Sequence, residues 1–211
     1  MSITTRFPRT NQELADLGGG QPVRFPGTEE EYWALLEEAA YRVDFYNNEI
    51  IAAMSYESDI HSDITNKLMF LLQTIFQGQE VRFGNSNRPV CIPDCNNAVF
   101  NPDGCVIQLP AKFYEYRPGM TAELTPLVLF EVLSSTTRVR DWGEKLPCYK
   151  QIPSLQQILY VDSERPRITV MERLEGHDKW LEIAYEKPGD RFSVQGRQLS
   201  VQEVYKGTLA L

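Results

Sequence analysis

Long apolar runs are missing from this sequence of 211 residues. No stretch comes near the roughly 18 consecutive apolar residues that a transmembrane helix needs, which excludes a helix that spans a membrane. The segment from Met1 to Arg24 also lacks the apolar core of a signal peptide. We therefore expect a protein that has no membrane partner and works in the cytoplasm.

An excess of positive charge is also missing. The chain has 21 Lys and Arg residues against 29 Asp and Glu residues, and its formal net charge is -8. This balance excludes a protein that binds nucleic acid over its whole surface by neutralising phosphates. It leaves room for a local basic cleft, and acidic residues at a metal site would contribute to the negative total.

The cysteines lack the paired CxxC spacing of a zinc knuckle. Four are present, at Cys91, Cys95, Cys105 and Cys148. Free cysteine is among the most buried residue types, and the cytoplasm keeps thiols reduced. We therefore expect four reduced and mostly buried thiols.

Proline and glycine residues divide the chain near its beginning. Residues 1–26 contain three prolines and the run Gly18-Gly19-Gly20, which predict an N-terminal arm or loose extension. Residues 27–211 are then expected to form a single domain.

Two helices are predicted early in this domain, on either side of a hairpin. Thr28 is followed by Glu31 at the spacing of a capping box, so the first helix begins there. Asn47-Asn48 tolerates the positive φ angles of a tight turn, and the apolar residues around it predict a β-hairpin. Apolar residues spaced by three and four positions predict a second helix over about 58–76.

Strands dominate the rest of the domain, with one further helix that begins at Asp141 and ends before Pro153. The predicted strands are 80–83, 88–92, 104–108, 126–133, 155–161, 168–172, 180–185 and 192–194. The nearly continuous apolar run 126–133 is typical of a central strand that is buried on both faces. The order predicts an α/β (mixed α+β) fold around one mixed sheet, with extra antiparallel strands toward the C-terminus.

Glu131 is the most informative position in the sequence. It lies in Leu129-Phe130-Glu131-Val132-Leu133, where alternation places it on the same face as apolar residues. An isolated buried carboxylate costs several kcal/mol, so it is protonated, paired or bound to metal. The alternative is that the strand emerges into solvent at Glu131.

Asp103 stands immediately before the short predicted strand 104–108. Asn-Pro-Asp-Gly is also a strong turn sequence, so Asp103 alone is explained equally well by a turn. Asp94 competes for the same role, but turn residues follow it, and we expect it in a loop. If adjacent strands bring Asp103 and Glu131 together, their carboxylates can hold Mg²⁺, which prefers oxygen ligands.

A wider set of motifs accompanies the two acids. Glu131-Val132-Leu133-Ser134-Ser135-Thr136-Thr137 is followed by Asp141, Lys145 and Tyr149, and then by Leu159-Tyr160-Val161-Asp162. Upstream, the predicted hairpin contains Asp44, and His61 lies near the start of the second helix. Together these motifs resemble the Uma-type family of restriction endonucleases, within the PD-(D/E)XK nuclease superfamily. The resemblance covers about residues 28–173 and implies a PD-(D/E)XK core, a central mixed sheet flanked by helices.

The resemblance also implies roles for individual residues. Asp103 and Glu131 become metal ligands, and Asp44 becomes a supporting acid, although the family usually has Glu at that place. The residue two positions after Glu131 is Leu133, where the motif has lysine, and Lys145 of the following helix is the matching cation. Asp141 and Lys145 lie on one helical face, so a surface ion pair between them is the alternative for Lys145.

Three further features have both a functional and a structural interpretation. His61 is either a general base or a helix residue with a local hydrogen bond, and the second interpretation is favoured. Tyr149 either packs or forms a hydrogen bond at the site. The loop Ser134–Thr137 lacks the Gly-x-Ser-x-Gly elbow of a nucleophile. It leads into Arg138 and Arg140, so it either contacts phosphate or is simply solvated.

These observations lead to two hypotheses about function. The first is a Mg²⁺-dependent endonuclease, also served by Mn²⁺, that hydrolyses phosphodiester bonds in DNA with two carboxylates and a lysine. The second is a non-catalytic nucleic-acid-binding or assembly module on the same fold, which the acidic balance and the displaced lysine favour. A homodimer is expected in either case, since many strand edges need to be covered.

Overall fold

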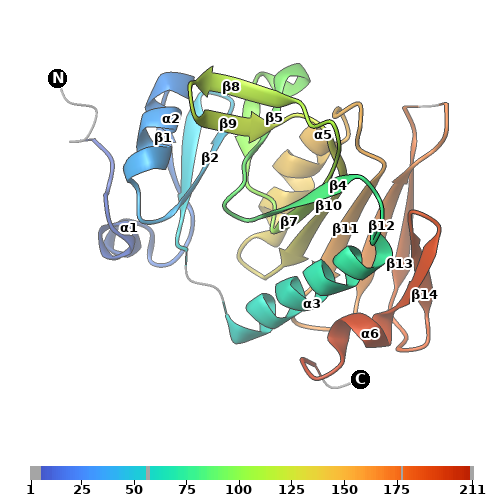
Figure 1. The fold of residues 1–211 in the computed structure, drawn as a ribbon. Helices are drawn as coiled ribbons and strands as arrows, with labels where there is room; N and C mark the ends of the chain where they lie inside the picture. Colours follow the sequence, from blue (N-terminus) through green and yellow to red (C-terminus); the bar gives the residue numbers. More distant parts are fainter. Residues whose placement is uncertain (1–5, 56–57, 177, 210–211) are drawn as a thin grey trace.

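Two large β-sheets form the body of the computed structural model, which describes residues 6–55, 58–176 and 178–209 (Figure 1). The first sheet has the strand order β1-β3-β2-β6-β5-β9-β8, and the second has the order β13-β12-β11-β10-β7-β4. Each sheet contains one parallel pair, β5 with β9 and β10 with β11. The mixed α/β class is therefore as predicted, but the strands are divided between two large sheets where the sequence indicated one.

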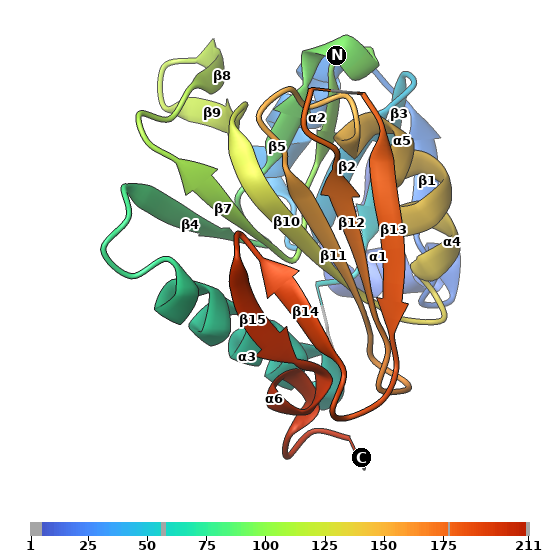
Figure 2. The ribbon, with the colours of Figure 1, turned by 90° about the vertical axis from the view of Figure 1, so that its right-hand side faces the viewer.

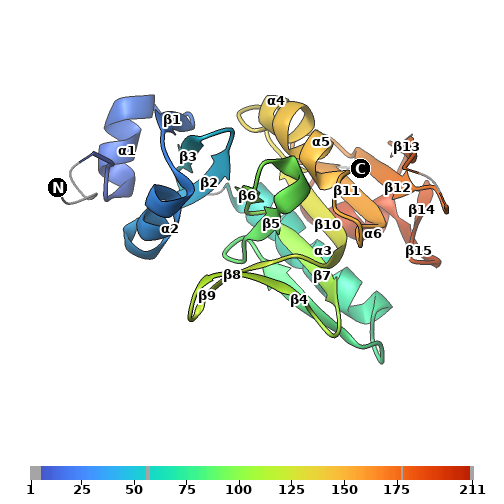
Figure 3. The same cartoon turned by 90° about the horizontal axis from the view of Figure 1, so that it is seen from above.

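The strands of the first sheet are β1 (Val23–Pro26), β2 (Arg42–Tyr46), β3 (Glu49–Ala53), β5 (Val90–Ile92), β6 (Ala98–Phe100), β8 (Phe113–Arg117) and β9 (Met120–Glu123). Those of the second are β4 (Val81–Asn85), β7 (Gly104–Gln108), β10 (Pro126–Leu133), β11 (Gln157–Asp162), β12 (Ile168–Arg173) and β13 (Trp180–Tyr185). A separate hairpin pairs β14 (Arg191–Val194) with β15 (Arg197–Ser200). Seen from above, β1, β2 and β3 lie to one side of β10, β11 and β12 (Figure 3).

Helical elements cover the sheets and connect their strands. They are α1 (Asn11–Gly18), α2 (Glu29–Glu38), α3 (Asp59–Ile75), η2 (Pro93–Cys95), α4 (Arg138–Arg140), the π-helical turn η3 (Asp141–Lys145), α5 (Leu146–Tyr149) and α6 (Val201–Tyr205). The helix predicted from Asp141 thus begins three residues earlier, and it ends before Pro153 as expected. None of the described helices combines the length and the apolar character that crossing a membrane requires.

Local sequence signals explain where several elements begin and turn. The Thr28 side chain accepts from the Glu31 amide and the Glu31 side chain accepts from the Thr28 amide, the predicted capping box of α2. Asn47 and Asn48 both have positive φ, at 51° and 60°, and join β2 to β3. Because the loop has only two residues, it fixes the register of the hairpin that carries Asp44.

The predicted N-terminal arm, residues 1–26, overlaps α1 and β1, and residues 1–5 of it lie outside the described residues. Thr10 caps α1 with a complete capping box, and β1 pairs with β3. Phe7 and Leu14 are buried in the core of the first sheet. The division of the chain into an arm and one domain stays a prediction.

The second sheet is covered on both faces, as the apolar run of β10 predicts. Val128, Phe130 and Val132 pack against α3 and α6, whereas Leu129 and Leu133 pack against α5. The ribbon shows α3 and α5 on opposite sides of this sheet (Figure 2). The alternation of β10 therefore turns Glu131 toward the face covered by α5.

The cysteine prediction is wrong for one pair. Cys95 of η2 and Cys148 of α5 form a disulfide. Their Cα atoms are 5.4 Å apart, and their sequence separation is 53. Packing of η2 against α5 creates this proximity, and the sequence spacing does not indicate it. Cys91 and Cys105 are free and buried as expected, and burial raises the pKa of both thiols to about 12.

Gly104 of β7 leaves space for the Phe130 ring of β10. Gly104 is paired with Phe130, and a Cβ atom at position 104 would overlap the Phe130 ring and lie 3.0 Å from Cε of Met69. We expect Gly104→Ala to lower the free energy of unfolding by about 1–3 kcal/mol, because the added methyl overpacks a closed core. Urea unfolding measures the change. Gly189→Ala is the control, since its methyl would meet no described atom within 4 Å, and an equal effect of both substitutions would contradict the prediction.

Candidate active site

Glu131 is buried at the end of β10, with its side chain 3 % exposed, so the strand does not emerge into solvent there. Its Oε1 atom accepts hydrogen bonds from Lys145 Nζ at 2.9 Å and from the Tyr149 hydroxyl at 2.7 Å. Burial raises the pKa of Glu131 to about 8, although the charge of Lys145 acts in the opposite direction. No donor among the described residues reaches Oε2, so one oxygen of this buried carboxylate is available to a ligand.

Lys145 is buried, with its side chain 7 % exposed, and it contacts two acids. Its Nζ lies 2.9 Å from Glu131 Oε1 and 3.0 Å from Asp141 Oδ1. Burial lowers the pKa of Lys145, but the charges of Asp141 and Glu131 outweigh burial and hold the pKa above its usual range. The pair with Asp141 is present, but it is buried rather than on the surface.

Asp103 reaches the same site through the pairing of β7 with β10. Because the two strands are antiparallel and Gly104 pairs with Phe130, the start of β7 lies beside the end of β10. Asp103 Oδ2 accepts from the Val132 amide at 2.7 Å, one residue after Glu131. The turn interpretation of Asp103 is therefore insufficient, since its carboxylate is buried against the central strand.

Two basic side chains contact Asp103. His61 Nε2 lies 3.1 Å from Oδ2, and Arg42 Nη1 lies 3.4 Å from Oδ1. Burial raises the pKa of Asp103, but the hydrogen bond and the charge of His61 outweigh it and hold the pKa below its usual value. His61 thus contacts the site directly, in addition to the local bond of its amide to the Ser58 side chain.

Asp44 enters the site from the first sheet. Its Oδ1 accepts from the Asn101 amide at 2.8 Å and from Asn101 Nδ2 at 3.0 Å, and its Oδ2 accepts from Arg140. Burial raises the pKa of Asp44, but the charges of Arg140 and Lys145 hold it below the usual value. Asp44 therefore links β2 to the helix that carries Lys145.

These residues line one small cavity of about 70 Å³. Its charged and titratable lining residues are Arg42, Asp44, His61, Asp103, Glu131, Arg140, Asp141 and Lys145. The structure thus brings together five of the six residues singled out in the sequence, and Tyr149 contacts the cavity through Glu131. The sequence predicts no site role for Arg42 or Asn101. It indicates Arg140 only as part of the basic stretch after the Ser134–Thr137 loop, and Asp141 only as a helix start, a part of the family motif and a partner of Lys145.

The oxygen donors of the cavity fit a divalent cation. Mg²⁺ is held in many proteins by one or two carboxylates, with water and substrate phosphate as the other ligands. Asp103 and Glu131 provide two such carboxylates, and Oε2 of Glu131 has no competing donor among the described residues. In the part of the chain that the structure describes, no cluster of three or more His, Cys, Asp or Glu side chains is arranged around an ion position. A metal here would therefore rely on water and substrate for its remaining ligands.

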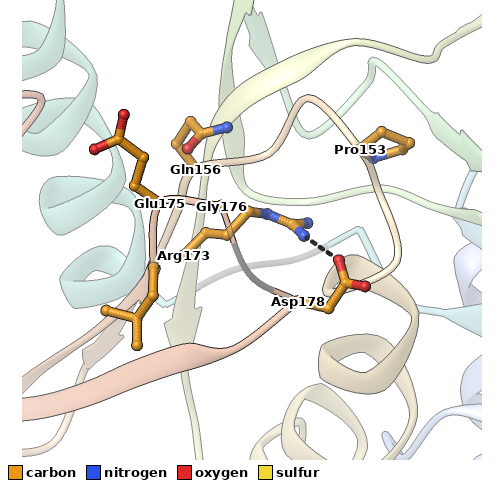
Figure 4. Close-up of a pocket in the computed structure, with 7 residues that line it drawn as sticks. Pro153, Gln156, Arg173, Glu175, Gly176 and Asp178 are labelled. Carbon is orange, nitrogen blue, oxygen red and sulfur yellow. Dashed lines mark ion pairs between the residues drawn. The ribbon is translucent and has the colours of Figure 1, made fainter.

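A larger hollow of about 440 Å³ lies elsewhere, between the end of α5 and the β12–β13 connection (Figure 4). Its Arg173 forms an ion pair of 3.7 Å with Asp178, which is drawn as a dashed line. The same guanidinium donates to the carbonyl oxygens of Lys150, Ile152 and Leu155. Arg173 therefore fixes the chain after α5, and the acids described above lie outside this hollow.

A mixed α/β fold with carboxylates and a lysine buried at the end of its central strand is that of a restriction-endonuclease-like protein. Residues 29–202 match the Uma2 family, described as "Putative restriction endonuclease", and the chain belongs to this family. The resemblance of the motifs between Asp44 and Asp162 to this family is thereby confirmed.

Two relatives and a solved structure are also similar to this chain. The chain is 28 % identical over 180 residues to the uncharacterized protein slr1290 of Synechocystis sp., covering 84 % of this chain and 90 % of that protein. It is 27 % identical over 154 residues to the uncharacterized protein sll1609 of the same organism, covering 73 % and 84 %. A putative nuclease from Anabaena variabilis has a similar fold, with a TM-score of 0.60, 16 % identity, and coverage of 96 % of this chain and all of that one.

Proposed function

We propose that this protein is a Mg²⁺-dependent endonuclease that hydrolyses phosphodiester bonds in DNA. The observation that carries the proposal is the buried trio of Glu131, Lys145 and Asp103, held at the end of β10 by short hydrogen bonds. Membership of a family described as restriction endonucleases supports it. A buried carboxylate beside a buried lysine is costly to maintain, and a catalytic use explains its presence.

Asp103 and Glu131 would hold the metal, with Mg²⁺ as the physiological ion and Mn²⁺ as its substitute. When bound, such an ion polarises the scissile phosphate, orients water and offsets the charge that develops during in-line displacement. The Val132 amide fixes the orientation of Asp103, and the Tyr149 hydroxyl fixes that of Glu131.

Lys145 would act on the phosphate and the attacking water. An ammonium group has three N–H donors, of which Glu131 accepts one, and Asp141 Oδ1 forms an ion pair with the same nitrogen at 3.0 Å. A remaining donor would bind a phosphate oxygen, since Lys145 is one of the residues that line the cavity. Asp44 supports the arrangement by accepting a hydrogen bond from Arg140, which lies on the same helical segment as Lys145. Arg42 places positive charge beside Asp103 and would attract the phosphate backbone, and the His61 ring contacts the same carboxylate.

The alternative function is a non-catalytic nucleic-acid-binding or assembly module. One observation favours it, namely that each acid already contacts a base, as in the pairs Asp44–Arg140, Glu131–Lys145 and Asp103–His61. In that case the acids balance buried cations and take no metal. Isothermal titration with Mn²⁺ separates the two functions, since only the nuclease takes up the ion at this cavity.

The test of the proposal is DNA cleavage by the purified chain. We expect supercoiled plasmid or single-stranded DNA to be cut in the presence of Mg²⁺ or Mn²⁺, and excess EDTA to stop the reaction. Each substrate is incubated with each metal over a range of protein concentrations. Absence of cleavage with every combination, together with no heat of Mn²⁺ binding, would reject the nuclease in favour of the alternative.

We further propose that the protein is a homodimer. The strand β13 lies at an edge of the second sheet, where Leu181 and Ile183 are exposed. Such an edge offers unpaired backbone groups together with apolar side chains, and a second copy of the chain would cover both.

A further inference from the structure

A second hollow of about 200 Å³ adjoins the candidate active site. We call it the arginine pocket, after its lining residues Arg138, Arg165 and Arg167, which surround Asp162. Its wall also contains Trp142 and Tyr160. Neither the family description nor the relatives assign it a role.

The arginine pocket and the candidate active site lie next to each other on β10 and β11. Glu131 is paired with Tyr160, and two residues further along the strands Leu133 is paired with Asp162. Two residues along a strand correspond to roughly 7 Å. Both positions face α5, because alternate residues of a strand share a face.

One helical segment separates the two hollows and contributes to both. Arg140, Asp141 and Lys145 line the candidate active site, whereas Arg138 and Trp142 line the arginine pocket. A chain molecule bound at Lys145 therefore has the arginine pocket as a direct neighbour.

The lining of the arginine pocket contains three guanidinium groups and one carboxylate. Two carboxylates outside the lining also contact these arginines, since Arg138 Nη2 lies 3.7 Å from Glu164 Oε2 and Arg167 Nη1 lies 2.5 Å from Glu186 Oε1. Asp162 Oδ2 accepts a hydrogen bond from Arg165 Nε at 3.2 Å and forms an ion pair with Arg138 Nη1 at 2.9 Å. Its Oδ1 accepts from the Glu164 amide at 2.9 Å. One buried aspartate thus orients two arginines, and each guanidinium has five N–H donors, most of which remain for a ligand. These remaining N–H donors suit an anionic ligand that presents several oxygen acceptors.

An aromatic wall completes the arginine pocket. The rings of Trp142 and Tyr160 are stacked, with centroids 4.7 Å apart and planes at 25°. The Tyr160 hydroxyl donates to the Asp141 carbonyl oxygen at 3.0 Å, which fixes the stack against the helix of Lys145. A flat apolar surface beside arginines suits a sugar or base attached to a phosphate better than it suits a small inorganic anion.

We propose that the arginine pocket binds a phosphodiester group of a nucleic-acid strand, next to the bond held at the candidate active site. The inference rests on the proposed function for the neighbouring cavity, since it assumes that the strand continues from there. Arg138 and Arg165 bind the phosphate, with Asp162 as the positioning residue behind them. Trp142 contacts the attached sugar or base.

Binding without cleavage tests this proposal. The probe is a fluorescein-labelled single-stranded oligodeoxynucleotide of about 12 nucleotides, and its duplex is the second probe. Fluorescence anisotropy is measured in EDTA at several salt concentrations, for the wild type and for Arg165→Gln. The Arg165 side chain is 59 % exposed, so its replacement should leave folding intact, which thermal unfolding verifies. Arg197→Gln is the matched control, because it removes the same charge from β15, on the sheet face opposite α5.

We expect Arg165→Gln to weaken binding about tenfold, since a charge-assisted hydrogen bond is lost. The slope of log affinity against log salt should fall by roughly 0.7 for the single strand, because one phosphate contact is removed. Arg197→Gln should change neither quantity. Trp142→Leu should weaken binding of the single strand without changing the salt slope.

Two results would overturn the inference: equal binding by Arg165→Gln and Arg197→Gln, or no binding of either probe by the wild type. Metal-dependent cleavage of the same oligonucleotide is measured in parallel. Cleavage by the wild type, together with oligonucleotide binding by Arg165→Gln that equals that of the wild type, would reject the proposed role of the arginine pocket and support the nuclease. Weaker binding by Arg165→Gln, in the absence of any cleavage by the wild type, would support phosphodiester binding in the arginine pocket and reject the nuclease function.

Discussion

Metal-dependent cleavage by the Glu131→Gln variant should fall by roughly 1,000-fold or more below that of the wild type. Glutamine has nearly the same volume as glutamate but no charge, so the cavity keeps its shape and loses a metal ligand. The Tyr149 hydroxyl can still donate to the amide oxygen, which leaves the packing of α5 against β10 in place. Lys145 keeps Asp141 as an ionic partner, so the substitution removes a proposed metal ligand without leaving the ammonium group unpaired.

The measurement is the initial rate of plasmid cleavage with Mg²⁺ and with Mn²⁺, together with Mn²⁺ titration of the same preparation. Asp103→Asn should likewise lose both cleavage activity and Mn²⁺ binding, because Asp103 would supply the second carboxylate. Glu172→Gln serves as the control, since this exposed side chain lies on β12 of the same sheet. Cleavage at the wild-type rate by Glu131→Gln would remove this residue from the proposed mechanism.

The largest effect on stability is expected from Lys145→Ala. The substitution leaves the carboxylates of Glu131 and Asp141 buried without the cation that contacts both. Breaking a buried ion pair by removing one partner costs about 3–5 kcal/mol, because the remaining charge is uncompensated. Urea unfolding at neutral pH should show this loss, and Lys112→Ala, at an exposed position, should change the free energy of unfolding little.

The pH dependence of the Lys145→Ala variant follows from the sign of the pKa shift. Burial raises the pKa of Glu131 to about 8 even beside Lys145, and loss of the ammonium group, whose charge lowers this pKa, raises it further. A raised pKa in the folded state means that the folded variant binds protons more strongly, so its stability increases as the pH falls through that pKa. The difference in the free energy of unfolding between variant and wild type should thus be largest at alkaline pH and narrow as the pH falls through about 8 toward neutral pH. A difference that stays constant over this range would show that the acids are not the cause.

Several parts of the site were predictable because the signals are local. Alternation along β10 placed Glu131 on a buried face, and the helical spacing of Lys145 and Tyr149 placed both on one side of their helix. Capping residues and the Asn47-Asn48 turn defined α2 and the β2–β3 hairpin. Each of these signals depends on residues within a few positions of one another, where chain connectivity already keeps them close.

Other parts depended on contacts between distant segments. Asp103 was equally compatible with a turn until the register of β7 against β10 placed its carboxylate on the Val132 amide. Asp44 lies in the other sheet, and the disulfide of Cys95 with Cys148 depends on how η2 packs on α5. The metal-binding and catalytic roles of these residues stay predictions, which the variants described above test.

The sequence by itself determined the buried acid of β10, the helix that carries Lys145, the family, and the mixed α/β class of the fold. Only the tertiary structure decided that the strands divide into two sheets, that Asp44, Asp103 and Glu131 share one cavity, and that the arginine pocket adjoins it. The physical reason is that periodicity and capping are properties of neighbouring residues, whereas strand register and sheet partners are selected by the packing of the whole core.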